Sequence, residues 1–157
     1  MNIPGLVIQM EAWSREELAA QKALLALLDR QEQAVSKNDT EELTAVSEEV
    51  QAHLKKNTGR DRRRQELVGR LATAFGVSAK TLTLESIAQR ASDLGIPTDG
   101  LLASREELRK ESAKVLRTGR RIASIARYHQ AFLNEVLRIF APDDDEAKEP
   151  VLLDARA

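Results

Sequence analysis

The sequence has no cysteine and few aromatic residues. The missing cysteines exclude disulfides, thiolate nucleophiles and cysteine metal ligands. Three Phe, one Tyr and one Trp are few for the core of a compact globule, whereas charged residues make up 31% of the chain. A composition rich in Leu, Ala, Glu and Arg is typical of long helices and coiled coils. We therefore expect an all-α protein whose core consists of aliphatic seams between helices.

Long apolar runs and glycine-rich catalytic motifs are also absent. No stretch approaches the roughly 18–20 apolar residues that cross a bilayer. The apolar start MNIPGLVIQM lacks the basic region and cleavage site of a signal peptide. There is no GxxxxGK[ST], GxGxxG or GxSxG motif to bind phosphate or position a nucleophile. We expect a cytoplasmic protein that is not an enzyme, binds no cofactor and does not insert stably into a membrane.

The residues that most often bind metals do not have the spacing of a metal site. His53 and His129 are the only histidines, and no HExxH pattern surrounds them. The triplet Asp143-Asp144-Asp145 lacks the alternating ligands, central Gly and closing Glu of an EF-hand loop. Runs of like charge with nearby prolines are typical of disordered segments. The sequence predicts no metal site, and an acidic disordered tail at residues 141–157.

Capping signatures predict where the first two helices begin. Ser14 and Glu17 fit a capping box, with Trp13 and Leu18 spaced for a hydrophobic staple, so a first helix is predicted over residues 14–37. The stretch from Asp39 repeats the signature and predicts a second helix over residues 39–75, followed by a terminating glycine. So short a connection makes the two helices antiparallel neighbours.

The second half of the chain predicts one short and one long helix. Thr83 caps a short connecting helix over residues 84–94, which Gly95 and Pro97 terminate. A last helix over residues 101–140 begins at Leu101 or at a third capping box at Ser104. We expect one domain, residues 1–140, forming an elongated antiparallel helical bundle or coiled coil of three long helices with a short connecting helix.

A coiled-coil seam runs along the last helix. Its residues alternate in steps of three and four, but the first half is interrupted by polar residues and only the second half is consistently apolar. The apolar and aromatic positions, with one histidine, are 101, 108, 115, 122, 125, 129, 132, 136 and 139, and the polar ones are Ser104, Glu111 and Thr118.

Residues 53–67, HLKKNTGRDRRRQEL, carry six basic and two acidic side chains. A mid-helix position spreads these charges around a cylinder. Helical spacing also provides the pairs Asp61–Arg64 and Arg62–Glu66, and no aromatic residue is interleaved to stack on bases. The stretch is therefore interpreted as a solvated helix midsection rather than a nucleic-acid site.

The end of the last helix, FLNEVLRIFAP, is apolar over an arc wider than one seam requires. It places four apolar residues on one side of the helix and two leucines beside them. Two interpretations remain open, ordinary core within the bundle or a groove for a partner's amphipathic helix.

Four motifs in this order resemble the FlgN-type flagellar export chaperones. They are LLALLDRQEQAVSKNDTEELTAVSEEV, RRQELVGRLATAFGV, TLTLESIAQRA and LLASREELRKESAKVLRTGRRIASIARYHQAFLNEVLRIF, and together they span about residues 15–140. The resemblance implies a non-catalytic, ATP-independent cytoplasmic chaperone. Such a chaperone holds the C-terminal helical segment of hook-associated proteins one and three, prevents its premature polymerisation and delivers it to the membrane export gate.

The resemblance makes the last helix the expected partner-binding element. Its substrate-binding residues are expected to be Phe132, Leu133, Val136, Leu137, Ile139 and Phe140. Tyr128 is expected to contact the export gate, and Val151, Leu152 and Leu153 of the tail to cover the empty groove. The alternative is a structural coiled-coil protein that forms a homodimer through the seam from Leu101 to Ile139.

Overall fold

The computed structural model describes residues 2–140, with Phe140 described by its backbone only. In this part of the chain the elements are all helical, and they confirm the predicted all-α fold of three long helices and a short connecting one. The elements are α1 (Ile3–Lys37), α2 (Thr40–Phe75), the short 3₁₀ helix η1 (Ala79–Thr81), α3 (Leu84–Asp93) and α4 (Asp99–Phe140).

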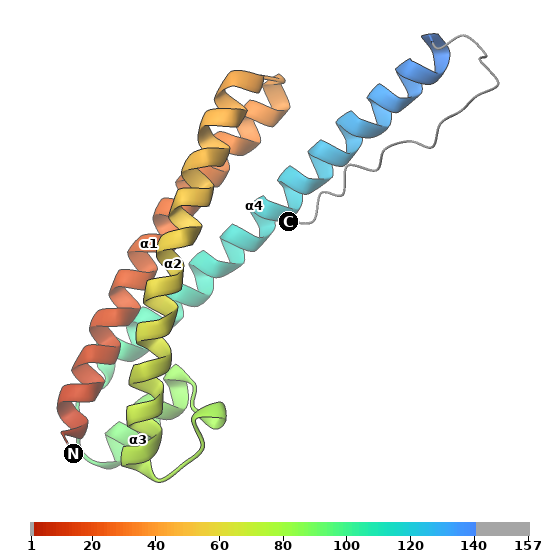
Figure 1. The fold of residues 1–157 in the computed structure, drawn as a ribbon. Coiled ribbons are helices and arrows are strands. Elements are labelled where there is room, and N and C mark those ends of the chain that lie inside the picture. Colours follow the sequence, from red (N-terminus) through yellow and green to blue (C-terminus); the bar gives the residue numbers. More distant parts are fainter. Residues whose placement is uncertain (1, 141–157) are drawn as a thin grey trace.

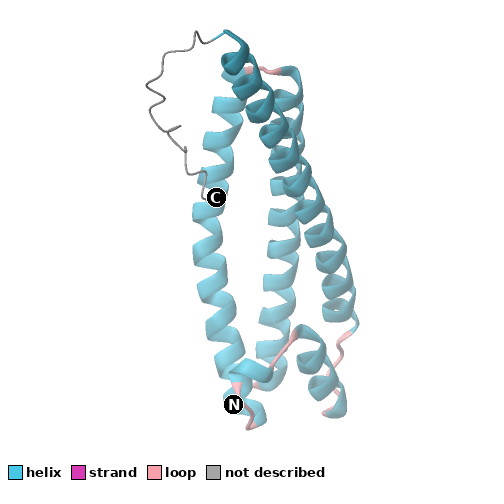
Figure 2. Cartoon of the chain, turned by 90° about the vertical axis from the view of Figure 1, so that its right-hand side faces the viewer, coloured by secondary structure: helices cyan, strands magenta, loops and turns pink. Residues whose placement is uncertain are grey.

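The three long helices share one base and separate towards the other end. Figure 1 shows α1 and α2 as an antiparallel hairpin, with α3 near the N-terminus and α4 rising from that base. Because Glu107 of α4 pairs with Lys22 of α1, and Arg121 pairs with Glu32 further along, α4 runs in the same direction as α1. In Figure 1 the second half of α4 diverges from the hairpin, and Figure 2 gives the view from the side.

The first helix begins eleven residues earlier than Ser14, so its predicted start is wrong. The Asn2 side chain accepts a hydrogen bond from the Gly5 N–H at 3.0 Å, and Pro4 lies in the first turn. Ser14 is buried within α1, and its hydroxyl donates to the Glu11 carbonyl at 2.7 Å. The helix extends to Ile3 because residues 3–13 have their own apolar face, which packs into the core.

Trp13 belongs to that face and is not the staple residue that the sequence predicts. Its indole is buried, and its Nε1 donates a hydrogen bond to the Arg60 carbonyl of α2 at 2.9 Å. A buried indole N–H requires an acceptor. The contact therefore joins α1 to α2 where the base of the bundle meets the polar middle of α2.

The main hydrophobic core lies at the base, where all four α-helices meet. Residues from each helix are almost completely shielded from solvent there. The buried members are Leu6, Val7, Met10, Trp13, Leu67, Leu71, Ile87, Ala88, Ala91 and Leu101. This core fixes the origin of α4 against the hairpin.

Asp39, Gly76 and Thr83 cap their helices as the sequence predicts. The Asp39 side chain accepts from the Glu42 N–H at 3.0 Å, and Gly76 closes α2 with a φ of 65°. Thr83 and Ser86 form a reciprocal capping box at the start of α3. The suggested box at Ser104 is wrong, because α4 begins at Asp99 and Ser104 is buried inside it.

The basic stretch of α2 is partly neutralised by α1. Arg60 pairs with Glu17 at 3.1 Å and Arg63 with Glu16 at 2.8 Å, both across the hairpin. The predicted Asp61–Arg64 pair is present at 3.1 Å, whereas Arg62 and Glu66 form no ion pair in the described chain. Part of this stretch therefore stabilises the hairpin.

The polar half of the α4 seam is the half that the chain buries. α4 packs mainly on α1, and Ser104, Glu111 and Thr118 are all buried. Further along, Arg121 donates to Glu32 of α1 at 2.8 and 3.1 Å. The hydrogen bond from Arg121 lowers the pKa of the Glu32 carboxyl below its ordinary value. Polar contacts thus hold the middle of α4 on α1.

Truncation of a core leucine is expected to destabilise the bundle. Leu71→Ala removes a completely buried side chain and should lower the free energy of unfolding by about 2–5 kcal/mol. Leu54→Ala makes the same chemical change in α2 where the side chain is 48% exposed, and should cost about 1 kcal/mol or less. Urea denaturation followed by circular dichroism measures both, and equal losses would contradict the position of the core.

The Glu32–Arg121 pair should contribute stability that depends on pH. Because the folded state lowers the pKa of Glu32, its contribution is full above the ordinary carboxyl value and disappears as the pH falls through the lowered value. Glu32→Gln should therefore be less stable than the wild type at pH 7, and the difference should vanish at the acidic end. Urea midpoints between pH 7 and 3 measure this, with the exposed Glu48→Gln as control. A difference independent of pH would refute the assignment.

Candidate partner-binding site

Large apolar side chains are exposed along the end of α4. Five of the ten exposed large hydrophobic residues in the described chain lie within the twelve residues from 128 to 139. They are Tyr128 at 71% exposure, Phe132 at 59%, Leu133 at 57%, Leu137 at 65% and Ile139 at 68%. We call these five residues, together with the half-buried Val136, the apolar arc. The ordinary-core alternative does not account for them, because no described part of the chain covers them.

The apolar arc covers about half of the helix circumference. At about 100° per residue, Tyr128 and Leu137 mark edges that are roughly 180° apart, and the other members lie between them. Phe140 is the last residue of α4, and its side chain lies outside the described structure. An arc this wide has room for two neighbouring helices, of which the hairpin supplies at most one.

The hairpin leaves the arc exposed because α4 diverges from it near its turn. Ser36, Lys37 and Asn38 at the end of α1 form one wall of a pocket of about 280 Å³. The opposite wall consists of His129, Phe132 and Leu133 of α4. Sequence patterns could not assign Ser36–Asn38 or His129 to this site, because some 90 residues of chain separate its two walls.

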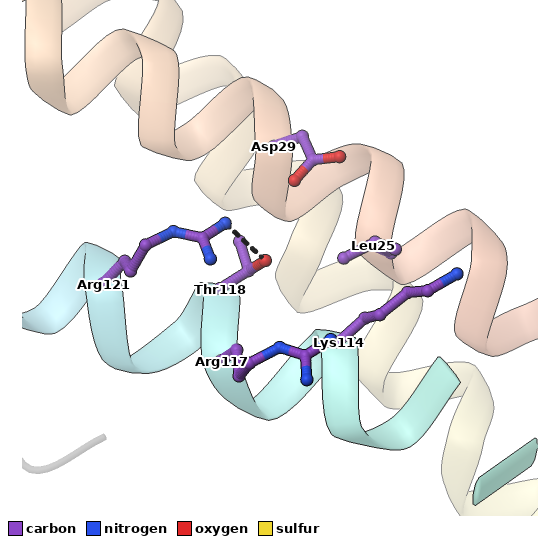
Figure 3. A pocket seen from close by; sticks show the side chains of 6 residues that line it. All are labelled: Leu25, Asp29, Lys114, Arg117, Thr118 and Arg121. Carbon is purple, nitrogen blue, oxygen red and sulfur yellow. Dashed lines mark hydrogen bonds between the residues drawn. The ribbon is translucent and has the colours of Figure 1, made fainter. Parts of the chain in front are cut away.

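A second pocket, between α1 and the middle of α4, is polar. Figure 3 shows that Leu25 and Asp29 of α1 line it opposite four residues of α4, and its volume is about 230 Å³. The α4 residues are Lys114, Arg117, Thr118 and Arg121. Arg121 donates to the Thr118 hydroxyl at 3.1 Å. The hydrogen bond to the Glu32 side chain raises the pKa of Arg121 above its ordinary value. Cationic residues of α4 therefore precede the apolar arc.

The described residues include an exposed apolar surface on α4 that is suited to binding. Among residues 2–140, no three His, Cys, Asp or Glu side chains lie close enough to hold a metal ion. None of the helices in that range has the length and hydropathy needed to cross a bilayer. The ring centroids of Tyr128 and His129 on α4 lie 6.2 Å apart. An exposed apolar helix face beside a pocket can accept an amphipathic helix.

The comparison with protein families assigns the chain to one of them. The family model described as FlgN protein matches residues 1–141, which include all the helices described above. Neither a curated protein nor a solved structure matches the chain. The chain therefore belongs to the FlgN family of flagellar export chaperones.

Proposed function

We propose that this chaperone binds the C-terminal helical segment of hook-associated proteins one and three through the apolar arc of α4. The supporting observation is the concentration of exposed apolar side chains between Tyr128 and Ile139. A second apolar helix laid on these residues would remove them from water, and the same contact would prevent the bound segment from polymerising.

The pocket at the hairpin turn extends this surface beyond α4. Phe132 and Leu133 belong both to the apolar arc and to the pocket wall. A bound helix lying along α4 therefore has a place for an apolar side chain between Phe132 and the end of α1. Ser36 and Asn38 would contribute polar contacts at the rim.

The complex is proposed to form in the cytoplasm and to be delivered to the flagellar export gate. Binding and release need neither a cofactor nor catalysis, because burial and exposure of apolar surface suffice. Tyr128 is the proposed gate contact, since its ring is 71% exposed at one edge of the arc. The proposed cover of the empty groove, Val151 to Leu153, lies outside the described residues.

A structural coiled-coil dimer is the competing function. Its seam was expected from Leu101 to Ile139, but α1 of the same chain packs on the first half of this seam. Only the seam positions from Ile122 onwards are left for a second copy. We therefore expect the free protein to be monomeric at micromolar concentration, as measured by light scattering. A stable dimer that does not dissociate on dilution would favour the competing function.

Polar substitutions in the apolar arc should abolish substrate binding without unfolding the protein. Phe132→Ser or Leu137→Ser removes a side chain more than half exposed, so the helix content should not change. Each should weaken binding of the C-terminal fragment of a hook-associated protein at least tenfold, since each removes apolar area from the interface. Calorimetric titration measures the affinity.

Leu116→Ser is the matched control for these variants. Leu116 is 61% exposed on the same helix but lies outside the apolar arc. Its substitution should leave the affinity within twofold of the wild type. Equal losses in all three variants, or micromolar binding that survives Phe132→Ser and Leu137→Ser, would refute the proposed site.

A further inference from the structure

The middle of α4 carries cations without carboxylates. From residue 112 to residue 134 the helix has five Lys and Arg side chains and no Asp or Glu. We call these five residues, Lys114, Arg117, Arg120, Arg121 and Arg127, the cationic segment. It is followed directly by the apolar arc on the same helix.

Three members of the cationic segment have no carboxylate partner in the described structure. Lys114 pairs with Glu111 at 2.7 Å and Arg121 with Glu32 at 2.8 Å. The ion pairs within residues 2–140 do not include Arg117, Arg120 or Arg127, all of which are exposed. The basic stretch of α2 differs in that it contains two carboxylates, Asp61 and Glu66, and three of its six cations, Arg60, Arg63 and Arg64, are paired.

Three members of the cationic segment, Lys114, Arg117 and Arg121, share one stripe of α4 with the Tyr128 edge of the apolar arc, whereas Arg120 flanks Arg117 outside the stripe and Arg127 lies further round the helix. Steps of three or four residues along α4 connect Lys114, Arg117, Arg121, Ser124, Tyr128 and Phe132. Ile139, seven residues after Phe132, lies on the same stripe. Figure 3 shows the first three of these side chains beside α1, where Asp29 is the acidic residue that lines the pocket. A helix laid along this stripe would meet positive charge at one end and apolar surface at the other.

We propose that the cationic segment binds an acidic stretch that flanks the apolar helix of the export substrate. This inference rests on the proposed function and adds the chemistry and direction of the bound segment. The occupant has carboxylates at the end that lies over Lys114, Arg117 and Arg121, with Arg120 at its side, and apolar side chains at the end that lies over the arc. Charge complementarity then fixes the direction in which the substrate lies and accelerates its association.

The four consecutive carboxylates at residues 143–146 follow the end of α4 too closely to reach Arg117. Glu146, the last of four consecutive carboxylates, is six residues beyond Phe140 and reaches at most about 20 Å from it. Arg117 lies 23 residues before Phe140, which is about 34 Å along the helix. Residues 143–146 therefore do not supply the carboxylates over Arg117.

The test is the double substitution Arg117→Glu/Arg120→Glu in the full chain, titrated with the C-terminal fragment of a hook-associated protein. Two reversed charges should weaken binding about tenfold at low salt. The wild-type affinity should also fall with added salt, and the variant should lose most of this dependence. Lys55→Glu/Lys56→Glu in α2 is the control with the same change in net charge, at two exposed lysines, and should bind like the wild type.

The outcomes separate this inference from the proposed function. If Phe132→Ser abolishes binding while Arg117→Glu/Arg120→Glu binds like the wild type at all salt concentrations, the cationic segment is not a substrate site and the apolar site stands. If Phe132→Ser has no effect, the proposed function fails first. Anionic lipid vesicles and duplex DNA are the other probes. Binding to either that requires Arg117 and Arg120, with fragment affinity unchanged, would overturn the inference in favour of that partner.

Discussion

The architecture depends on how α4 is attached to the α1–α2 hairpin. The attachment combines a hydrophobic base around Leu101 with a polar seam along the middle of α4, ending near the Glu32–Arg121 pair. Buried polar residues such as Thr118 give less stabilisation than a seam of leucines, but they require particular partners. The attachment therefore fixes the position and direction of α4 without using its most apolar residues.

This distribution of polarity places the buried apolar residues at the base and leaves apolar residues exposed at the end of α4. The base core shields its leucines almost completely, whereas the apolar arc leaves side chains of similar size more than half exposed. Exposed apolar surface of this kind favours association with a partner and is a liability in a protein that has none. The FlgN family assignment supports the proposal that this surface binds an export substrate.

Much of the fold follows from local signals in the sequence. Asp39, Thr83 and Gly76 occupy their capping positions because the interactions that define a cap lie within a few residues of each other. The same reasoning failed at Ser14, where a capping pattern occurs inside a helix. There the long-range burial of Met10 and Trp13 outweighs the local signal.

The candidate site was only partly accessible to sequence analysis. Periodicity identified the apolar residues from Phe132 to Ile139, but not which half of the α4 seam the hairpin covers. The polar positions Ser104, Glu111 and Thr118 suggested that the first half of the α4 seam packs weakly, yet these three residues are buried. The pocket that joins Asn38 to Leu133 depends on the path of α4 past the hairpin turn, which no local pattern encodes.

The central claim is that the end of α4 is uncovered in the free chaperone and covered by its substrate. Since the chain has no cysteine, Leu137→Cys introduces a single thiol whose maleimide labelling rate reports accessibility. We expect rapid labelling of the free protein and at least tenfold slower labelling with saturating C-terminal fragment of a hook-associated protein. Leu54→Cys, on α2 away from the apolar arc, should label at the same rate in both states. Slow labelling of Leu137→Cys in the free protein, or a rate that the fragment does not change, would contradict the account.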